Sequence, residues 1–527
     1  MRTLVGDEVD GVGTVTPETP ETAEPNRTGL VPSWAISAAV AAAVAVGVAL
    51  RFYSRSNLWL DEALSVNIAR LSLGDLLDAL RHDGHPPLYY LLLHYWMDLV
   101  GDGDNAVRLL SGFFGVACLP LAWIAGRRVA GSAGARWTVV VVALSPYAIR
   151  YSTETRMYSL VMLLVLAGYL LVNDALHDPK TWRLVSIAVI TGLLLLSHYW
   201  AFWLVAAVGL MLLWRWRQRP ASRAATARVV VAVAGGGLLF LPWLSGFLYQ
   251  SRHTGTPWAQ PVRPTMLIEM TLQDLGGGEV SEGKLGGAVI LILCLLALFV
   301  ARSARNEMVL DMRTVPTVRT ELVIVAMTAA IGCLVGYATG ATYQARYAAV
   351  FVPLVLLATA VGLTRIPGLA QWVAGGLFLA LSLGGIGWVE YYQRTESGPV
   401  AAAVAERAHP GDVVVYCPDQ LGPGYSREMP DALVELAYPT MGSPDRVDWV
   451  DYADRNAKAD PKELADQVRR DYAGHAAFVV WKPSYRTFGQ QCEDFVNALG
   501  GGEQIVSVDE SAYYEPANLA WIGELRG

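Results

Sequence analysis

The sequence is dominated by apolar windows of roughly the 20 residues that a helix needs to cross a bilayer. Eleven such windows run approximately over 34–51, 106–126, 135–152, 157–174, 183–200, 201–214, 229–249, 284–301, 320–338, 347–364 and 369–389. The composition agrees, because 54% of the residues are hydrophobic and only 17% are charged. The net charge of -7 and the five cysteines exclude a basic nucleic-acid binder and a disulfide scaffold. We predict an all-α polytopic membrane protein with about 11 transmembrane helices.

Basic residues mark alternate loops between these windows. If the N-terminus is cytoplasmic, the internal loops contain Arg127, Arg128, Lys180, Arg183, Arg215, Arg217, Arg219, Arg223, Arg228, Arg302, Arg305, Arg313, Arg319 and Arg365. Because loops rich in Lys and Arg stay in the cytoplasm, this alternation predicts a multi-pass protein of the cytoplasmic (inner or plasma) membrane. The other loops and the segment after the last window then lie on the extracytoplasmic side.

The first external loop, 52–105, is predicted to contain two helices that lie on the membrane surface. The stretch 63–80 has leucine and isoleucine at helical spacing and acidic residues elsewhere, which is typical of an amphipathic helix. Leu88–Val100 is apolar but has only 13 residues. If it crossed the membrane, Arg127 and Arg128 would lie outside, so we expect an interfacial or re-entrant helix.

The chain divides into three parts by composition. Residues 1–33 are polar and rich in Pro, Thr and Glu, which predicts a disordered cytoplasmic tail. Residues 34–394 form the transmembrane domain. In 395–527, strand-like 411–417 and 475–482 alternate with helix-like 400–408 and 461–473, which indicates an extracytoplasmic α/β domain. Cys417 and Cys492 in this domain form either a disulfide or two free buried thiols, and the sequence leaves both alternatives open.

Polar residues that are unusual beside apolar segments gather on the predicted external side. They are Asp61, Glu62, His85 (which follows Gly84), Glu154, Arg156, Tyr158, His198, Arg346 and Tyr347. Ionisable groups at the edge of membrane segments are costly and are often functional. Structural explanations stay open: the acidic pair at 61–62 could cap a helix, and Glu154 could pair with Arg156. Arg346 could extend its charged end to the membrane–water interface, and the histidines could be buried groups with ordinary hydrogen-bond partners.

Five stretches carry a resemblance to a known family. They are LWLDEAL, HDGHPPLYYLLLHYW, AVRLLSGFFGVACLPLAWIAGRR, SPYAIRYSTETRMYSL and QARYAAVFVPLV. In this layout the chain resembles the GT-C class of membrane glycosyltransferases, above all the protein O-mannosyltransferases and lipid A aminoarabinose transferases (glycosyltransferase family 39-like). The resemblance covers most of residues 50–160 and weakens through about residue 365. It implies a GT-C fold, a polyprenyl-phosphate sugar donor, an external active site and inversion at the anomeric carbon.

The resemblance also implies roles for individual residues. The catalytic base of the family corresponds to Asp61, and its second acidic position corresponds to Glu154. His85 stands where the family often has a lysine. In the aminoarabinose transferases a glutamate before that position helps to bind zinc, whereas this chain has Gly84 there. A divalent metal therefore stays possible, and its ligands are unknown.

The expected chemistry gives each polar residue a task. We expect Asp61, Glu62 and Glu154 to be catalytic, because an inverting displacement needs a carboxylate that removes the proton of the acceptor hydroxyl. The expected substrate-binding residues are His85, Arg156, Tyr158, His198, Arg346 and Tyr347. Among these, the arginines are suited to hold phosphate oxygens. Aromatic residues that are expected to stack on sugar or prenyl groups, or to form an interfacial belt, are Trp59, Tyr89, Tyr90, Tyr199, Trp200, Trp243 and Trp258.

The sequence therefore predicts a glycosyltransferase that moves mannose or arabinose from a polyprenyl phosphate to an extracytoplasmic acceptor. The acceptor is a cell-wall glycan, a glycolipid or a protein, membrane lipids surround the enzyme, and no nucleic acid takes part. Two alternatives stay open. One is a transporter or flippase of lipid-linked intermediates, which would need ionisable residues near the middle of the membrane. The other is a non-catalytic membrane scaffold with an external binding domain.

Overall fold

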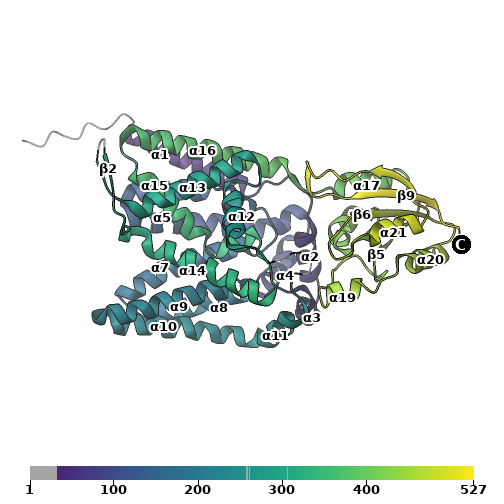
Figure 1. Cartoon of the computed structure of the whole chain (residues 1–527), viewed down its shortest axis with the longest axis horizontal. Helices are drawn as coiled ribbons and strands as arrows, with labels where there is room; N and C mark the ends of the chain where they lie inside the picture. The colour runs from purple at the N-terminus through teal and green to yellow at the C-terminus, as the bar shows by residue number, and fades with distance from the viewer. Residues whose placement is uncertain (1–31, 257–258, 260, 305–306, 527) are drawn as a thin grey trace, which may run out of the picture.

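The computed structural model describes residues 32–256, 259, 261–304 and 307–526. The predicted polar tail lies almost wholly outside the described residues, as do Trp258 and Arg305. The described chain forms a helical bundle with a smaller sheet-containing domain at one end (Figure 1). Helices of the first external loop lie between the two (Figure 1).

The bundle is built from helices of very different length. They are α1 (Ser33–Leu50), α5 (Asp104–Ala143), α6 (Pro146–Arg150), α7 (Tyr158–His177), α8 (Thr181–Ser197), α9 (Ala201–Gln218), α10 (Arg223–Gly236), α11 (Leu244–His253), α12 (Pro264–Gly276), α13 (Ser281–Phe299), α14 (Pro316–Thr339), α15 (Val352–Arg365) and α16 (Gly368–Tyr391). Short 3-10 turns η1 (Pro220–Ser222), η2 (Gly237–Trp243) and η3 (Ala345–Val350) and a hairpin of β1 (Val300–Ala304) with β2 (Glu307–Leu310) connect them. The central helix α15 is buried over Val352–Leu363, in contact with α5 and α13.

The helices confirm the predicted polytopic fold class. Within the described residues, seven helical stretches are long and apolar enough to cross a membrane: α1, α5, α7, Pro220–His253, α13, α14 and α16. α8 and α15 are shorter apolar helices. The 40-residue α5 contains one predicted window, 106–126, and the start of the next, 135–152. Its backbone is not helical at Ala130 and Gly131, between the two windows, and the φ of 65° at Gly131 is one that glycine adopts readily. All eleven predicted windows fall on helical segments, and the number of crossings stays a prediction.

The first external loop differs from its prediction in one respect. The single helix expected over 63–80 is wrong, because the chain forms α2 (Leu60–Ala69) and α3 (Leu73–Asp83), while α4 (Leu88–Val100) has the predicted bounds. The helix is interrupted between α2 and α3 because Ser72 caps a new helix: its hydroxyl accepts a hydrogen bond from the Asp75 N–H at 3.5 Å. Nearly every residue of α2 is buried. This helix therefore packs inside the protein instead of lying on the membrane surface.

The C-terminal domain has helices on both faces of a sheet. Its strands are β3 (Gln393–Thr395), β4 (Val413–Cys417), β5 (Val434–Ala437), β6 (Ala476–Trp481), β7 (Glu503–Val506), β8 (Tyr513–Glu515) and β9 (Asn518–Glu524). Its helical segments are α17 (Ser397–Ala405), η4 (Asp419–Leu421), α18 (Gly422–Tyr425), η5 (Ser426–Glu428), α19 (Tyr452–Asn456), α20 (Pro461–Asp471) and α21 (Gln491–Ala498). Five strands form a sheet in the order β5-β4-β6-β9-β7, with β4 parallel to both neighbours. β3 pairs separately with β8.

Alternating side chains of the central strand explain this layered arrangement. Val413 and Val415 belong to the apolar cluster that includes residues of α20 and α21, whereas Val414 and Tyr416 belong to the cluster on the other face, with α17. The structure also answers the cysteine question, because Cys417 at the end of β4 forms a disulfide with Cys492 of α21. The cross-link joins the sheet to the helix that covers it.

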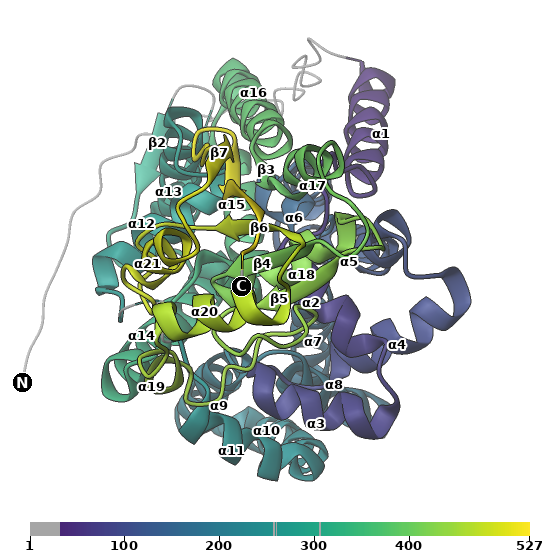
Figure 2. The ribbon, with the colours of Figure 1, turned by 90° about the vertical axis from the view of Figure 1, so that its right-hand side faces the viewer.

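The C-terminal domain docks on the first external loop (Figure 2). The Asn67 side-chain amide donates to the Asp445 carbonyl at 2.8 Å, and the Trp449 N–H donates to the His82 carbonyl at 3.0 Å. Gly424 permits the close approach, because a Cβ atom at that position would lie 3.1 Å from the Leu58 carbonyl oxygen. The segment that carries Asp61 is thus held between bundle and domain.

Candidate functional site

A cavity of about 1000 Å³ lies at the junction of the bundle with the C-terminal domain. Its bundle side is lined from the first loop (59–61, Leu64 and 83–86), from 198–200, from the end of α11 and the turn after it, and from 339–342, Arg346 and Tyr347. Its other side is lined by the C-terminal domain at Pro418, Gln420, Leu421, Trp449, 451–454, Lys482, Tyr485, Arg486 and 514–515. Of the nine predicted site residues, Asp61, His85, His198, Arg346 and Tyr347 line this cavity.

Asp61 and Arg346 meet in the cavity wall. Asp61 lies in the first turn of α2, and its Oδ2 is 3.3 Å from Nη2 of Arg346. The guanidinium lies over the rings of Trp59 at 5.5 Å and Tyr347 at 5.9 Å, which are cation–π distances. Among the described residues, Oδ2 of Asp61 accepts no hydrogen bond. Oδ2 is itself buried and ion-paired with Arg346, but the Asp61 side chain as a whole is 16% exposed and lines the cavity, so its carboxylate can accept a proton there.

His85 connects the cavity to a buried hydrogen-bond chain. Its Nδ1 lies 2.8 Å from Oδ2 of Asp83, and its Nε2 lies 2.8 Å from Nη2 of Arg156. A guanidinium only donates, so Nε2 accepts and the ring proton is on Nδ1, where it is donated to Asp83. Asp83 also accepts the Tyr90 hydroxyl at 2.7 Å. The sequence analysis did not select Asp83, whose side chain becomes important only through this fold.

Arg156 and Tyr158 lie behind the cavity and do not line it. Arg156 is buried, and its Nη1 donates to the Ser65 hydroxyl at 2.9 Å and to the Asp61 carbonyl at 3.2 Å. Tyr158 is also buried, with its ring 5.9 Å from that of His198. Arg156 does not line the cavity, and its predicted contact with phosphate stays a prediction. The arginine supports α2 from within.

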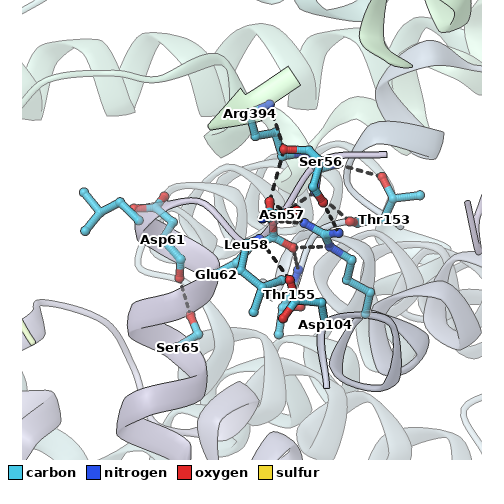
Figure 3. A network of polar contacts seen from close by, with 12 residues as sticks. Ser56, Asn57, Leu58, Asp61, Glu62, Ser65, Asp104, Thr153, Thr155 and Arg394 are labelled. Carbon is cyan, nitrogen blue, oxygen red and sulfur yellow. Dashed lines mark hydrogen bonds and ion pairs between the residues drawn. The ribbon is translucent and has the colours of Figure 1, made fainter. Parts of the chain in front are cut away.

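Glu62 faces away from the cavity, into a buried ionic cluster (Figure 3). Arg108 binds both of its carboxylate oxygens at 2.7 and 2.8 Å, Arg394 donates at 3.1 Å, and the Thr155 N–H donates at 2.9 Å. Successive helical residues point about 100° apart, so only one of the acidic pair can face the cavity. Burial raises the pKa of Glu62, but Arg108 and Arg394 outweigh it and lower that pKa to about 2. The catalytic role expected for Glu62 does not fit this position.

Glu154 is buried near this cluster and likewise does not line the cavity. Among the described residues, neither of its carboxylate oxygens has a hydrogen-bond partner. Burial raises its pKa to about 6, although Arg394 acts in the opposite direction. The ion pair with Arg156 that the sequence left open is not among the salt bridges of the described residues. Its catalytic role stays a prediction.

His198 and Tyr347 form an aromatic wall of the cavity. Their rings are 5.1 Å apart, and the Trp200 N–H donates to Nδ1 of His198 at 3.1 Å. Because Nδ1 accepts, the ring proton is on Nε2, which is then the donor of this histidine. η3, which carries Arg346 and Tyr347, is held by the Tyr147 hydroxyl, which donates to the Arg346 carbonyl at 2.9 Å. The wall thus offers a hydrogen-bond donor beside aromatic faces.

The sequence analysis missed the side of the cavity that the C-terminal domain supplies. Gln420, Lys482, Tyr485, Arg486 and Glu515 line it. No motif marks these residues, because they come from separate loops that only the domain docking brings over Asp61. Within the described residues, no group of three or more His, Cys, Asp or Glu side chains is suited to hold a metal ion.

Comparison with known proteins gives one sequence match and several structural ones. Residues 84–245 match the family model of dolichyl-phosphate-mannose-protein mannosyltransferases. The structure is similar to ArnT from Cupriavidus metallidurans in the apo state, with a TM-score of 0.57 and 13% identity over 94% of this chain and 99% of that chain. ArnT bound to undecaprenyl phosphate gives 0.55 and 14% over 94% and 100%. No curated protein sequence matches the chain.

The structural likeness concerns the fold, and the family match concerns part of the sequence. The matched segment 84–245 contains five of the nine predicted site residues, namely His85, Glu154, Arg156, Tyr158 and His198. The likeness to ArnT extends over both the bundle and the C-terminal domain, since it covers 94% of the chain. The protein therefore has the GT-C fold of multi-pass membrane glycosyltransferases, and its residues 84–245 resemble the protein mannosyltransferase family.

Proposed function

We propose that this chain is an inverting glycosyltransferase that moves a sugar from a polyprenyl phosphate to an extracytoplasmic acceptor. The observation that carries the proposal is the pair of Asp61 and Arg346 in the wall of a cavity of about 1000 Å³. The pair puts a carboxylate that lines the cavity beside a guanidinium suited to phosphate. The family match and the ArnT structure bound to undecaprenyl phosphate support a lipid-linked donor.

The reaction is a single displacement at the anomeric carbon. The Asp61 carboxylate takes the proton of the acceptor hydroxyl while the hydroxyl oxygen forms a bond to the anomeric carbon. The bond between this carbon and the phosphate oxygen breaks on the opposite side, and its electron pair leaves with the phosphate. The products are a glycosylated acceptor of inverted configuration and a polyprenyl phosphate.

The leaving polyprenyl phosphate needs its negative charge neutralised more than it needs a proton. Arg346 provides this neutralisation, because its side chain lines the cavity and its planar guanidinium can donate two parallel hydrogen bonds to phosphate oxygens. His85 contributes differently from the expectation, since both of its ring nitrogens are already engaged by Asp83 and Arg156. It keeps Arg156 in place behind α2. The Nε2 of His198 is a donor for the sugar or the phosphate.

Replacing Arg346 by Ala is expected to reduce kcat/KM for the donor by about 10- to 100-fold. A charge-assisted hydrogen bond contributes roughly 1.5–3 kcal/mol, and lysine would restore the charge without the planar fork. Initial rates at varied donor concentration measure this effect for Arg346→Ala and Arg346→Lys. Arg81→Ala on the exposed face of α3 is the matched control. An unchanged donor dependence in Arg346→Ala would remove this arginine from phosphate binding.

The C-terminal domain and the cavity are proposed to lie outside the cytoplasmic membrane. The disulfide between Cys417 and Cys492 supports this side, because disulfides persist in oxidising compartments. In a Cys333→Ala background, Ser507→Cys is expected to react with a membrane-impermeant maleimide added to intact cells. Gln218→Cys, at the end of α9, is expected to react only after the membrane is opened. The reverse pattern would place the domain in the cytoplasm.

An assay of sugar transfer from lipid-linked donors tests the proposed function. Vesicles that contain the purified protein are supplied with labelled polyprenyl-phosphate mannose or polyprenyl-phosphate arabinose and with cell-wall glycan, glycolipid or protein acceptors. We expect transfer of one of these sugars to one of these acceptor classes. Movement of the intact lipid-linked sugar between leaflets without transfer would instead show a flippase. Binding of acceptor without either activity would show a scaffold.

A further inference from the structure

The C-terminal domain contacts the start of the helix that carries Asp61. Oε2 of Glu515, at the end of β8, accepts the N–H of Leu60 at 3.1 Å. The neighbouring Tyr514 packs edge-on against Trp59, with ring centroids 5.3 Å apart. Both Glu515 and Asp61 line the cavity. A residue 455 positions away in sequence thus holds the backbone directly before Asp61.

The sequence of α2 explains why this contact matters. The first turn of a helix has N–H groups without helical partners, and a Ser, Thr, Asp or Asn at the N-cap usually accepts one of them. The N-cap of α2 is Trp59, which makes no side-chain capping hydrogen bond. The Glu515 carboxyl supplies an acceptor at this end of the helix. The orientation of the first turn, and so of Asp61, therefore depends on the C-terminal domain.

We propose that Glu515 is a positioning residue of the active site, which fixes the start of α2 beside Asp61. The proposal rests on the proposed function in so far as Asp61 is the base. It makes the C-terminal domain a part of the catalytic centre and not only a cover or an acceptor-binding module. Glu62 and Arg156 hold the inner side of the first turn of α2, whereas the Leu60 N–H has Glu515 as its acceptor, so loss of Glu515 loosens the start of α2 beside Asp61. A displacement of about 1 Å can cost 100-fold in rate.

The charge of Glu515 is controlled by the groups around it. Burial raises its pKa to about 8, the Leu60 N–H and Lys482 act against this rise, and Asp61 adds to it. The hydroxyls of Tyr425 and Tyr485 are further titratable groups near it. Well below pH 8 the carboxyl is therefore mostly protonated, and Asp61 then has little additional negative charge beside it. Above pH 8 Glu515 ionises, and the added negative charge weakens binding of the donor phosphate.

Three variants separate positioning from general stability. Glu515→Ala removes the acceptor for the Leu60 N–H, Glu515→Gln keeps an acceptor oxygen and stays neutral at every pH, and the exposed Glu406→Ala in the same domain is the control. Hydrogen exchange of the peptide that contains Leu60 is measured first, because it does not depend on activity. We expect faster exchange in Glu515→Ala and wild-type exchange in the other two variants. Equal exchange in all variants would overturn the proposal.

Kinetics with the polyprenyl-phosphate donor then test the consequence for catalysis. We expect Glu515→Ala to lose about 10- to 100-fold in kcat, with donor KM at pH 7 close to that of the wild type. Glu515→Gln is expected to match the wild type at pH 7 and to lack the rise in donor KM above pH 8. A Glu515→Ala enzyme with wild-type kcat would overturn the proposal while leaving the proposed function intact. Failure of wild-type transfer would count against the function instead, and the exchange experiment would still decide the contact.

Discussion

Replacing Asp61 by Asn is expected to lower sugar transfer by about 100- to 10,000-fold, because a positioned general base contributes that much to a rate. Asparagine keeps the size of the side chain but cannot take the proton of the acceptor hydroxyl. The contact with Arg346, 3.3 Å in the wild type, changes from an ion pair to a neutral one. Binding of polyprenyl phosphate is therefore expected to persist while transfer is lost. Initial rates and lipid binding, measured on the same preparation, check both parts.

The control for this experiment is a neighbouring acidic residue that does not line the cavity. Asp78 is exposed on α3, so Asp78→Asn is expected to leave transfer unchanged. Protein levels of both variants should match those of the wild type, and thermal stability is measured alongside the rates, because Asp61→Asn replaces the ion pair with Arg346 by a neutral contact. Wild-type transfer by Asp61→Asn would show that another group takes the proton.

Replacing Glu62 by Ala is expected to destabilise the folded protein by about 3–5 kcal/mol, as removal of one partner of a buried ion pair typically does. Glu62 holds Arg108 of α5 and Arg394 of β3, so its loss leaves two buried guanidinium groups without their carboxylate. The Arg394 side chain also donates to the Thr153 carbonyl at 2.7 Å. The junction between bundle and domain should therefore loosen first. Thermal unfolding in detergent and protease sensitivity near residue 395 measure this.

The pH dependence of this stabilisation follows from the lowered pKa of Glu62. The folded-state pKa is about 2 against an ordinary value of 4.5, so the contribution is complete above about pH 4.5 and is lost as the pH falls towards 2. The difference in unfolding temperature between wild type and Glu62→Gln should thus be constant near neutral pH and shrink in acid. Glu406→Gln is the exposed control. If Glu62→Gln lost activity without any loss of stability, Glu62 would instead belong with the catalytic residues.

Local patterns in the sequence predicted the helices and strands better than they predicted the functional site. The apolar windows and the alternating strands of the C-terminal domain are local patterns, and the helices and strands lie where these patterns predicted them. The acidic pair at 61–62 shows the limit of local reasoning. Both residues were expected to be catalytic, yet the rotation of α2 sends Glu62 to Arg108 and leaves Asp61 in the cavity.

Contacts between distant segments explain what the sequence did not reveal. Arg156 looked like a phosphate ligand, but Ser65, Tyr90 and His85 surround it behind the cavity. Glu515 carries no motif, because its importance comes only from the backbone of Leu60 against which β8 is placed. Such contacts depend on how parts of the fold pack together, and no motif or residue spacing in the sequence predicts that packing.

The anomeric configuration of the sugar in the product, with wild type and Asp61→Asn compared in the same vesicles, decides whether Asp61 drives a single displacement. We expect the wild type to form a product of inverted configuration and to release one polyprenyl phosphate for each sugar transferred. We expect Asp61→Asn to form almost no product. Retention of configuration, or equal product formation by both proteins, would contradict a single displacement driven by Asp61.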